Sequence, residues 1–300
     1  MSTKIYFEEY GGPEGLKVGE ESLATPGEGE VQVSYRAIAV NPVDWQLAAG
    51  YLRQWVPLDL PVVPGNDAAG VVKAVGPGVS RFAVGDELIW NGFTGGYRAA
   101  ANVPAAQLTA IPAGLDFEQA ACIPVAGGTA YSALKQLGVG EGDTVLIHAA
   151  AGGVGSAAVQ MARDLGTRVI GTASEANHEY LRGLGAEPVT YGDGLVDRVR
   201  ALGEVTAVLD AVGGEASVTA TQELLPDLSR AVTTVADEHS MGAGIAAVQQ
   251  LDTRVADVAG MAADGKLTFN IYERLPLTEA ARAFEISQGG HVRGKIVLIP

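Results

Sequence analysis

The chain has 300 residues, of which 47% are hydrophobic, and it carries a formal net charge of −15 at neutral pH. This length allows two ordinary domains, each with its own buried core. The acidic balance argues against partners such as nucleic-acid phosphates and anionic membrane surfaces. The single cysteine, Cys122, excludes an intrachain disulfide, and its apolar neighbours favour a buried thiol over a nucleophile.

No targeting segment is evident in the sequence. The first residues lack the charged start, apolar core and small-residue cleavage site of a signal peptide, and no run of about 18 uncharged apolar residues occurs. We therefore expect a cytoplasmic protein that does not span a membrane.

The first third of the chain has the pattern of short β-strands. Residues 31–37 alternate between apolar and polar side chains, as in a half-buried strand. Glycine and proline pairs, such as those in Gly76-Pro77-Gly78, recur between the apolar runs. Short strands with such turns predict a barrel-like β domain.

Helical patterns begin near Asp116, which is followed by a capped helix start over 116–121 and by a second helix around 127–134. From Thr144 onward, strand and helix patterns alternate. The predicted strands cover 144–149, 168–172, 205–210 and 230–235, and the predicted helices cover 154–165, 179–184 and 251–265. This order predicts a parallel, doubly wound sheet. The tail adds a helix over 276–288 and a strand over 294–300.

A glycine-rich run, Ala149-Ala150-Ala151-Gly152-Gly153-Val154-Gly155, joins the strand at 144–149 to the next helix. Unpaired N–H groups and the helix dipole make such a junction a phosphate site, and glycines let the backbone approach a pyrophosphate. Aligned on Gly-x-Gly-x-x-Gly, the run has Ala150, Gly152 and Gly155. It predicts a dinucleotide site, and the alternative is an ordinary tight strand–helix turn.

The residues at the end of the following strand bear on the choice of cofactor. NAD sites place an acid there to hold the ribose 2′-hydroxyl, but this chain has Ala173 and then Ser174. Ser174, Tyr191 and a protonated His178 would each suit a 2′-phosphate. Glu175 lies one residue beyond the expected position of that acid and is an argument for NAD. The pattern favours NADPH.

Several motifs in order along the chain carry a family resemblance. They are Asn41-Pro42-Val43-Asp44, Pro64-Gly65-Asn66-Asp67-Ala68-Ala69-Gly70, Gly76-Pro77-Gly78-Val79, Gly85-Asp86, Gly128-Thr129-Ala130-Tyr131, the alanine-glycine loop and Gly294-Lys295-Ile296-Val297-Leu298. Over essentially its whole length the chain resembles the zinc-free quinone oxidoreductase, or zeta-crystallin-like, branch of the medium-chain dehydrogenase/reductase superfamily.

The resemblance implies an α/β protein of two domains. A GroES-like β-barrel catalytic domain would span 1–120 and 266–300, and a Rossmann NADPH-binding domain would span 121–265. The active site would be the cleft between them, which is a usual place for a ligand pocket. Relatives commonly form homodimers through the edge of the nucleotide-domain sheet, and we expect the same here.

The resemblance also assigns roles to individual residues. Those expected to bind the cofactor are Asn41, Thr129, Ala151, Gly152, Gly153, Val154, Ser174, His178, Tyr191, Val212 and Val235. Asn41 would lie beside the nicotinamide and is a catalytic candidate. The family often has lysine where this chain has His178. Tyr51 is the second catalytic candidate, as a proton donor or substrate contact. It is one residue out of register with the Gly-x-Tyr of related reductases, and a packing tyrosine is the alternative.

No metal is expected. Zinc-binding relatives carry a cysteine near Ile38 and a Gly-His-Glu run where this chain has Gly65-Asn66-Asp67. A catalytic zinc normally needs three protein ligands, and the four histidines, at 148, 178, 239 and 291, are widely scattered in the sequence.

The leading hypothesis is therefore hydride transfer from NADPH to a small hydrophobic quinone or α,β-unsaturated carbonyl compound, without zinc. An enoyl-thioester reductase of fatty-acid or polyketide type is the enzymatic alternative. A non-catalytic NADPH- or RNA-binding protein is the alternative from another class, although the negative charge disfavours RNA.

Overall fold

The computed structural model describes residues 1–300 and divides into two compact units. The first unit comprises Met1–Val125 and Asn270–Pro300, and the second comprises Ala126–Phe269. The sequence places these divisions a few residues earlier, after residues 120 and 265. The chain leaves the first unit within a π-helical turn, η3 (Ile123–Gly127).

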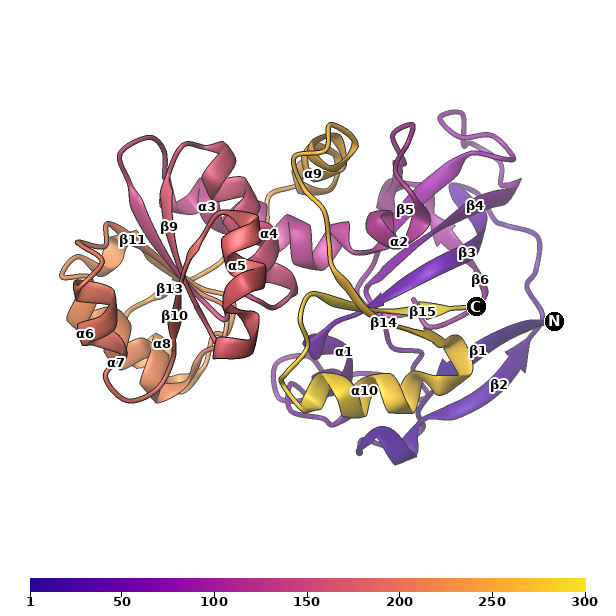
Figure 1. Cartoon of the computed structure of the whole chain (residues 1–300). Helices are drawn as coiled ribbons and strands as arrows, with labels where there is room; N and C mark the ends of the chain where they lie inside the picture. The colour runs from indigo at the N-terminus through magenta and orange to yellow at the C-terminus, as the bar shows by residue number, and fades with distance from the viewer. The chain divides into compact units, whose positions relative to one another are not determined.

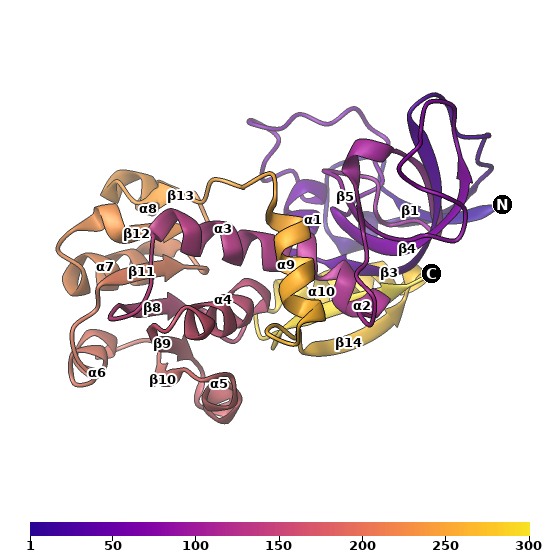
Figure 2. The same cartoon turned by 90° about the horizontal axis from the view of Figure 1, so that it is seen from above.

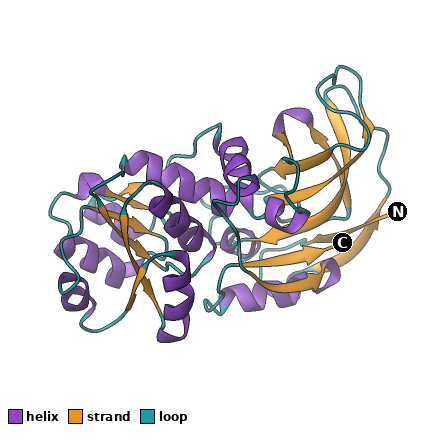
Figure 3. Cartoon of the chain, turned by 45° about the horizontal axis from the view of Figure 1, so that its top comes forward, coloured by secondary structure: helices purple, strands orange, loops and turns teal.

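The first unit is built on a seven-stranded sheet of order β14-β15-β3-β4-β5-β7, with β6 also paired to β3. Strands dominate this unit and both chain ends lie in it (Figure 3). Its strands are β1 (Ser2–Tyr6), β2 (Lys17–Glu21), β3 (Glu30–Val40), β4 (Asp67–Val75), β5 (Glu87–Asn91), β6 (Ala100–Pro104), β7 (Leu108–Ala110), β14 (Ile271–Pro276) and β15 (Lys295–Ile299). Its helices and 3₁₀ turns are η1 (Pro13–Gly15), α1 (Pro42–Ala48), η2 (Ala105–Gln107), α2 (Phe117–Ala121), η6 (Leu277–Glu279) and α10 (Ala280–Gln288).

The central strand β3 connects the early part of the chain to its tail. In its first half, Val31, Val33 and Tyr35 are buried and alternate with partly exposed polar residues, as the pattern predicts. Its last four residues are all buried, because α2 packs on this part of the sheet. Here β15 pairs antiparallel with β3, Ile296 opposite Val40. The tail of the chain is thereby brought beside the end of β3.

The second unit is a six-stranded parallel sheet of order β10-β9-β8-β11-β12-β13. Figure 1 shows this sheet edge-on, with α3, α4 and α5 on one face and α6, α7 and α8 on the other, and Figure 2 shows the strand order from above. Its strands are β8 (Thr144–His148), β9 (Arg168–Ala173), β10 (Glu187–Thr190), β11 (Ala207–Asp210), β12 (Ala231–Thr233) and β13 (Ala246–Ala247). Its helices and 3₁₀ turns are α3 (Gly128–Leu137), α4 (Gly153–Asp164), η4 (Glu175–Asn177), α5 (His178–Leu184), α6 (Leu195–Arg200), α7 (Gly214–Leu224), η5 (Leu228–Arg230), α8 (Glu238–Ala243) and α9 (Arg254–Ala263).

The predicted doubly wound parallel sheet is confirmed. The strands β8 and β11 are almost continuously apolar because helices cover both faces of the sheet. Strand order reverses direction between β8 and β11, the switch point at which such sheets bind ligands. None of the helices is long and apolar enough to cross a bilayer.

The structure differs from the predicted elements after β11, where one strand is shorter than predicted and a helix follows that was not predicted. The predicted strand over 230–235 is only Ala231–Thr233, because the hydroxyl of Thr233 turns the chain by accepting from the N–H of Val235 (3.0 Å). The glycine-containing stretch after it forms α8, a short helix capped by the side chain of Asp237. Local capping thus overrides the strand pattern there.

Candidate cofactor and active site

The glycine-rich loop is a tight junction between β8 and α4. The N–H of Ala150 donates to the carbonyl oxygen of Thr172 (3.0 Å), and the N–H of Gly152 donates to that of Ala149 (3.0 Å). Ala149 has a left-handed φ of 51°, held by a hydrogen bond from its N–H to the Thr172 hydroxyl (3.1 Å). A strained non-glycine residue at a strand–helix junction indicates a backbone held in place by its surroundings.

Gly155 lets α4 pack against this loop. A Cβ atom there would lie 2.3 Å from the carbonyl oxygen of Ala149 and 2.7 Å from Cα of Ala150. Gly152 caps α4 with extended backbone and no side-chain hydrogen bond, so the first N–H groups of the helix remain available to an anion. Ala150, at the first glycine position of the fingerprint, fits because Gly171 of β9 has no side chain facing it. The loop meets the steric requirements of a dinucleotide site.

Polar side chains gather at the ends of β9 and β10. These parallel strands pair Thr190 with Ala173, so the residues that follow them lie at one edge. Ser174 accepts from Nδ2 of Asn177 (3.3 Å), which leaves its own hydroxyl proton available to an acceptor such as a phosphate. Nε2 of His178 lies 3.4 Å from the hydroxyl of Thr190.

The loop after β10 carries Tyr191, whose side chain is exposed. Arg198 of α6 holds this loop by donating to the carbonyl oxygens of Thr190 (2.8 Å), Asp193 (2.7 Å) and Gly192 (3.2 Å). The predicted phosphate-binding residues Ser174, His178 and Tyr191 therefore share one edge of the sheet, beside the glycine loop's strand.

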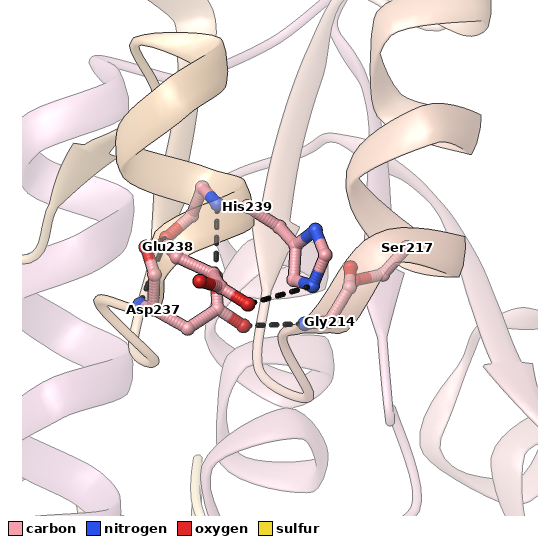
Figure 4. Close-up of polar contacts among 6 residues, drawn as sticks. Gly214, Ser217, Asp237, Glu238 and His239 are labelled. Atoms are coloured by element: carbon pink, nitrogen blue, oxygen red, sulfur yellow. Dashed lines mark hydrogen bonds and ion pairs between the residues drawn. The ribbon is translucent and has the colours of Figure 1, made fainter.

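On the other side of the switch point, β11 and β12 end in two further loops. Asp210 accepts from the N–H groups of Val212 and Gly213 (3.0 Å each) and so shapes the first loop. Val212 is exposed, and Val235 of the second loop packs where a side chain at Gly213 would lie. Asp237 joins the two loops: its Oδ2 accepts from the N–H of Gly214 (2.6 Å), a contact drawn in Figure 4.

Thr129 and His148, on elements next to these loops, are both buried. Thr129 of α3 accepts from Nε2 of Gln250 (3.0 Å), which orients its hydroxyl. His148, the last residue of β8, lies 3.4 Å from the hydroxyl of Thr221. Burial lowers the pKa of His148, although the neighbouring Asp210 carboxylate opposes this. His148 is therefore neutral at neutral pH and is a structural residue at the carboxyl end of β8.

In the first unit, Asn41 is the centre of a buried polar network. Its Nδ2 donates to Oδ2 of Asp67 (2.9 Å), and its Oδ1 accepts from Nζ of Lys295 (2.5 Å). The same ammonium donates to the carbonyl oxygen of Val40 (2.6 Å). Both ends of the Asn41 amide are engaged with side chains of its own unit, which fixes its orientation.

Asp44 is the second carboxylate of this network. Its Oδ2 accepts from the N–H of Asn41 (2.9 Å) and from the hydroxyl of Tyr97 (3.0 Å), while its Oδ1 has no hydrogen-bond partner. Burial raises the pKa of Asp44 to about 7; the two donors oppose the shift and the nearby Asp67 carboxylate adds to it. One charge in the network is therefore easily lost near neutral pH.

Tyr51, the second catalytic candidate, is an exposed aromatic side chain. Tyr51 and Trp55 are 66% and 72% exposed, and the ring of Tyr51 meets Trp45 edge-on at 5.9 Å between centroids. Trp90 is a core residue whose Nε1 donates to Oε1 of Gln107 (2.9 Å). Cys122 is buried as expected, and burial raises the pKa of its thiol to about 12.

The structure does not bring metal-binding side chains together. No group of three or more His, Cys, Asp or Glu side chains lies in an arrangement that would hold a metal ion. At the position of the zinc relatives' Gly-His-Glu run, Asn66 donates to the carbonyl oxygen of Gly92 (3.3 Å), and Asp67 also accepts from the N–H of Val125 (3.2 Å).

Comparison with known proteins agrees with this geometry. Residues 27–113 match the family model of the alcohol dehydrogenase GroES-like domain, and residues 184–298 match that of the zinc-binding dehydrogenases. The quinone oxidoreductase of Salmonella typhimurium is 32% identical over 331 aligned positions that cover 100% of both chains. The chain belongs to the quinone oxidoreductase family of the medium-chain dehydrogenase/reductase superfamily. The predicted family and the GroES-like fold of the first unit are thereby confirmed.

Solved structures give the same result. The Escherichia coli quinone oxidoreductase in complex with NADPH has a TM-score of 0.85 and 28% identity, covering 99% of this chain and 100% of its own. A solved NAD-dependent alcohol dehydrogenase has a TM-score of 0.89 and 30% identity, with 99% of each chain covered. Fold similarity therefore spans proteins described with either dinucleotide.

Several residues of these networks have no distinct role in the sequence pattern. Asp67 and Lys295 stand there only as members of family motifs, and Tyr97 and Asp237 belong to none of the predicted site residues. Asp67 and Lys295 have a recognisable signal, a charged first residue in an otherwise mostly apolar strand, whereas Tyr97 and Asp237 lie in loops. A charged residue in an apolar strand predicts a buried polar contact, but its partner is set by strand pairing between distant parts of the chain.

We expect Gly155→Ala to destabilise the second unit by about 1–3 kcal/mol, because the added Cβ would overlap backbone atoms of Ala149 and Ala150. Gly183→Ala, on α5, is the control, because a Cβ added there would have nothing within 4 Å. Chemical denaturation of both variants checks this. Equal stability of the two would contradict the close approach at Gly155.

We expect the free energy of unfolding to fall by about 3 kcal/mol between pH 5 and pH 8 through Asp44 alone. Its folded pKa, about 7, lies above the unfolded value of 3.8. The folded state therefore binds the proton more tightly, and this stabilisation is lost as the pH rises through 7. Asp44→Asn should lack this component, as urea unfolding of both proteins at the two pH values would reveal. Parallel pH profiles of the two proteins would refute the assignment.

Proposed function

We propose that this oxidoreductase transfers a hydride from NADPH to a quinone or an α,β-unsaturated carbonyl compound. The observation that carries the proposal is the glycine loop. Only glycine at 155 allows α4 to start against the end of β8, at the switch point of a doubly wound sheet. Its relatives include quinone oxidoreductases over the full length, one of them solved with NADPH.

The choice of NADPH over NADH rests on the edge formed by β9 and β10. The strand end has no acid: Ala173 is followed by Ser174, whose hydroxyl proton is available. Tyr191 supplies a second hydroxyl in the loop fastened by Arg198, and His178 a ring nitrogen. In this proposal these three residues bind the 2′-phosphate. Glu175 is exposed at the start of η4.

The remaining residues fit the other parts of the cofactor. Ala151, Gly152, Gly153 and Val154 would bind the pyrophosphate at the start of α4. Thr129, Val212 and Val235 would lie along the nicotinamide half. When bound, NADPH supplies the hydride. The first unit would contribute Asn41, whose amide is held in one orientation by Lys295 and Asp67 before any ligand arrives.

The proposed acceptor follows from the groups that the site offers. The side chains lack a three-ligand metal cluster, so we propose that no zinc polarises the substrate. A conjugated carbonyl spreads developing negative charge onto its oxygen, where N–H or O–H donors stabilise it. The exposed Tyr51 hydroxyl is the proposed proton donor, and the Tyr51 and Trp55 rings offer apolar surface to a flat substrate.

The test is NADPH oxidation with a panel of quinones and enones. We expect turnover of at least one acceptor, unaffected by a metal chelator. Saturation of a crotonyl thioester in preference to quinones would support the enoyl-reductase alternative. Binding of NADPH without turnover of any acceptor would overturn the proposed reaction, and a salt-sensitive RNA gel shift would favour the non-catalytic alternative.

We expect Ser174→Asp to weaken NADPH binding by about tenfold, because a carboxylate at the strand end would repel the 2′-phosphate. Binding of NADH should be unchanged or tighter, since the carboxylate can accept from the ribose hydroxyl. Ser22→Asp, at an exposed site in the first unit, controls for the added charge. Fluorescence titration of both coenzymes measures the effect. An equal loss for both coenzymes would contradict the assigned phosphate site.

A further inference from the structure

The side chain of Asp237 bridges the loops that follow β11 and β12 (Figure 4). One oxygen, Oδ2, accepts from the N–H of Gly214 at the start of α7 (2.6 Å). The other, Oδ1, accepts from the N–H of Ser240 in the first turn of α8 (2.8 Å). A single carboxylate therefore ties together the beginnings of two helices.

The bridge is supported by contacts on both sides. The hydroxyl of Ser240 donates to the carbonyl oxygen of Val235 (3.1 Å), which fastens the second loop to α8. Gly213 has a left-handed φ of 72°, and a Cβ there would lie 2.8 Å from Cγ1 of Val235 and 3.0 Å from Oδ2 of Asp237. The first loop thus fits against the second without space for another side chain.

Asp237 is ionised at neutral pH. The N–H of Ser240 is the main cause that lowers the pKa of Asp237, against the effect of burial, and the N–H of Gly214 adds to it. Charge-assisted bonds from backbone N–H groups to a carboxylate are stronger than neutral ones. The bridge is therefore present under the conditions in which an oxidoreductase would work.

Both bridged loops lie on one side of the switch point. In a doubly wound sheet the glycine-loop strand and its next neighbours bind the adenosine half, and the strands beyond the switch point face the other half. Here β8, β9 and β10 form the first group, and β11 and β12 form the second. The bridge therefore concerns the nicotinamide half alone.

We propose that Asp237 is a positioning residue that holds the loops at 211–214 and 235–240 in one arrangement for the nicotinamide half of the dinucleotide. This inference rests on the proposed function. It assigns no contact between Asp237 and the cofactor: the carboxylate acts through Val212 and Val235, which the two loops carry.

The test compares NADPH with adenosine 2′,5′-bisphosphate, a fragment without the nicotinamide half. In Asp237→Ala we expect the Kd of NADPH to rise about tenfold, as for loss of a strong cap, while the Kd of the fragment stays within about twofold of the wild-type value. Asp237→Asn keeps one acceptor oxygen, so its Kd for NADPH should lie between those of the wild type and Asp237→Ala. Calorimetric titration measures both ligands.

Asp227→Ala is the matched control. Asp227 also accepts from a backbone N–H, that of Ser229 (3.0 Å), but it precedes β12 and so lies at the opposite end of that strand. Its loss should leave both Kd values unchanged. If Asp237→Ala does not fold, Asp237→Asn carries the comparison.

Two results would overturn the inference: an unchanged Kd for NADPH in the Asp237 variants, or an equal loss for NADPH and the fragment, which indicates a general structural role. Failure of the proposed function is distinct, because it is measured on the wild-type protein, which would then bind neither ligand or would bind NADPH without turnover of any acceptor.

Discussion

The contact between Lys295 and Asn41 is the interaction on which the first unit depends. The two residues are 254 positions apart, and they meet because β15 pairs with the end of β3. Lys295 brings a positive charge into a region that holds the buried carboxylates of Asp44 and Asp67. Such charges would be costly to bury without a partner of opposite charge. The pairing of β15 with β3 therefore sets both the charge balance of this region and the orientation of the Asn41 amide.

The second unit is organised by a different constraint, the close approach of backbone to backbone. At Gly155 the helix α4 lies against the loop that precedes it, and at Gly213 one loop lies against the next. Both places leave N–H groups at the starts of helices, but their fates differ. Those of α4 have no side-chain partner, whereas the N–H of Gly214 is taken by Asp237. The same local geometry thus serves an anion-binding loop in one place and a structural bridge in the other.

Much of the fold could be predicted from the sequence because its signals are local. The alternation in β3, the cap at Asp116 and the apolar run of β8 each depend on a few neighbouring residues, and the structure has all three. The glycine loop was predictable for the same reason. The partners of Asn41, Asp44 and Asp237 were not, because each is set by strand order and by chain segments far apart. Tyr51 shows a further limit, since spacing alone did not distinguish an exposed ring from a packed one.

The chain passes through the second unit before it completes the first. Ala126–Phe269 is continuous, so during synthesis all of its strands are available before β14 and β15 exist. Until then β6 can pair with the first half of β3, but the last residues of β3, 38–40, lack their partner strand, and this exposed edge is open to wrong pairing. The nucleotide-fold unit can therefore form first and act as a folded insertion that brings the two parts of the first unit together. Pairing β15 with β3 closes a loop that contains this whole unit of more than a hundred residues. Because the unit is already folded, closing the loop costs less chain entropy than it would with an unfolded segment.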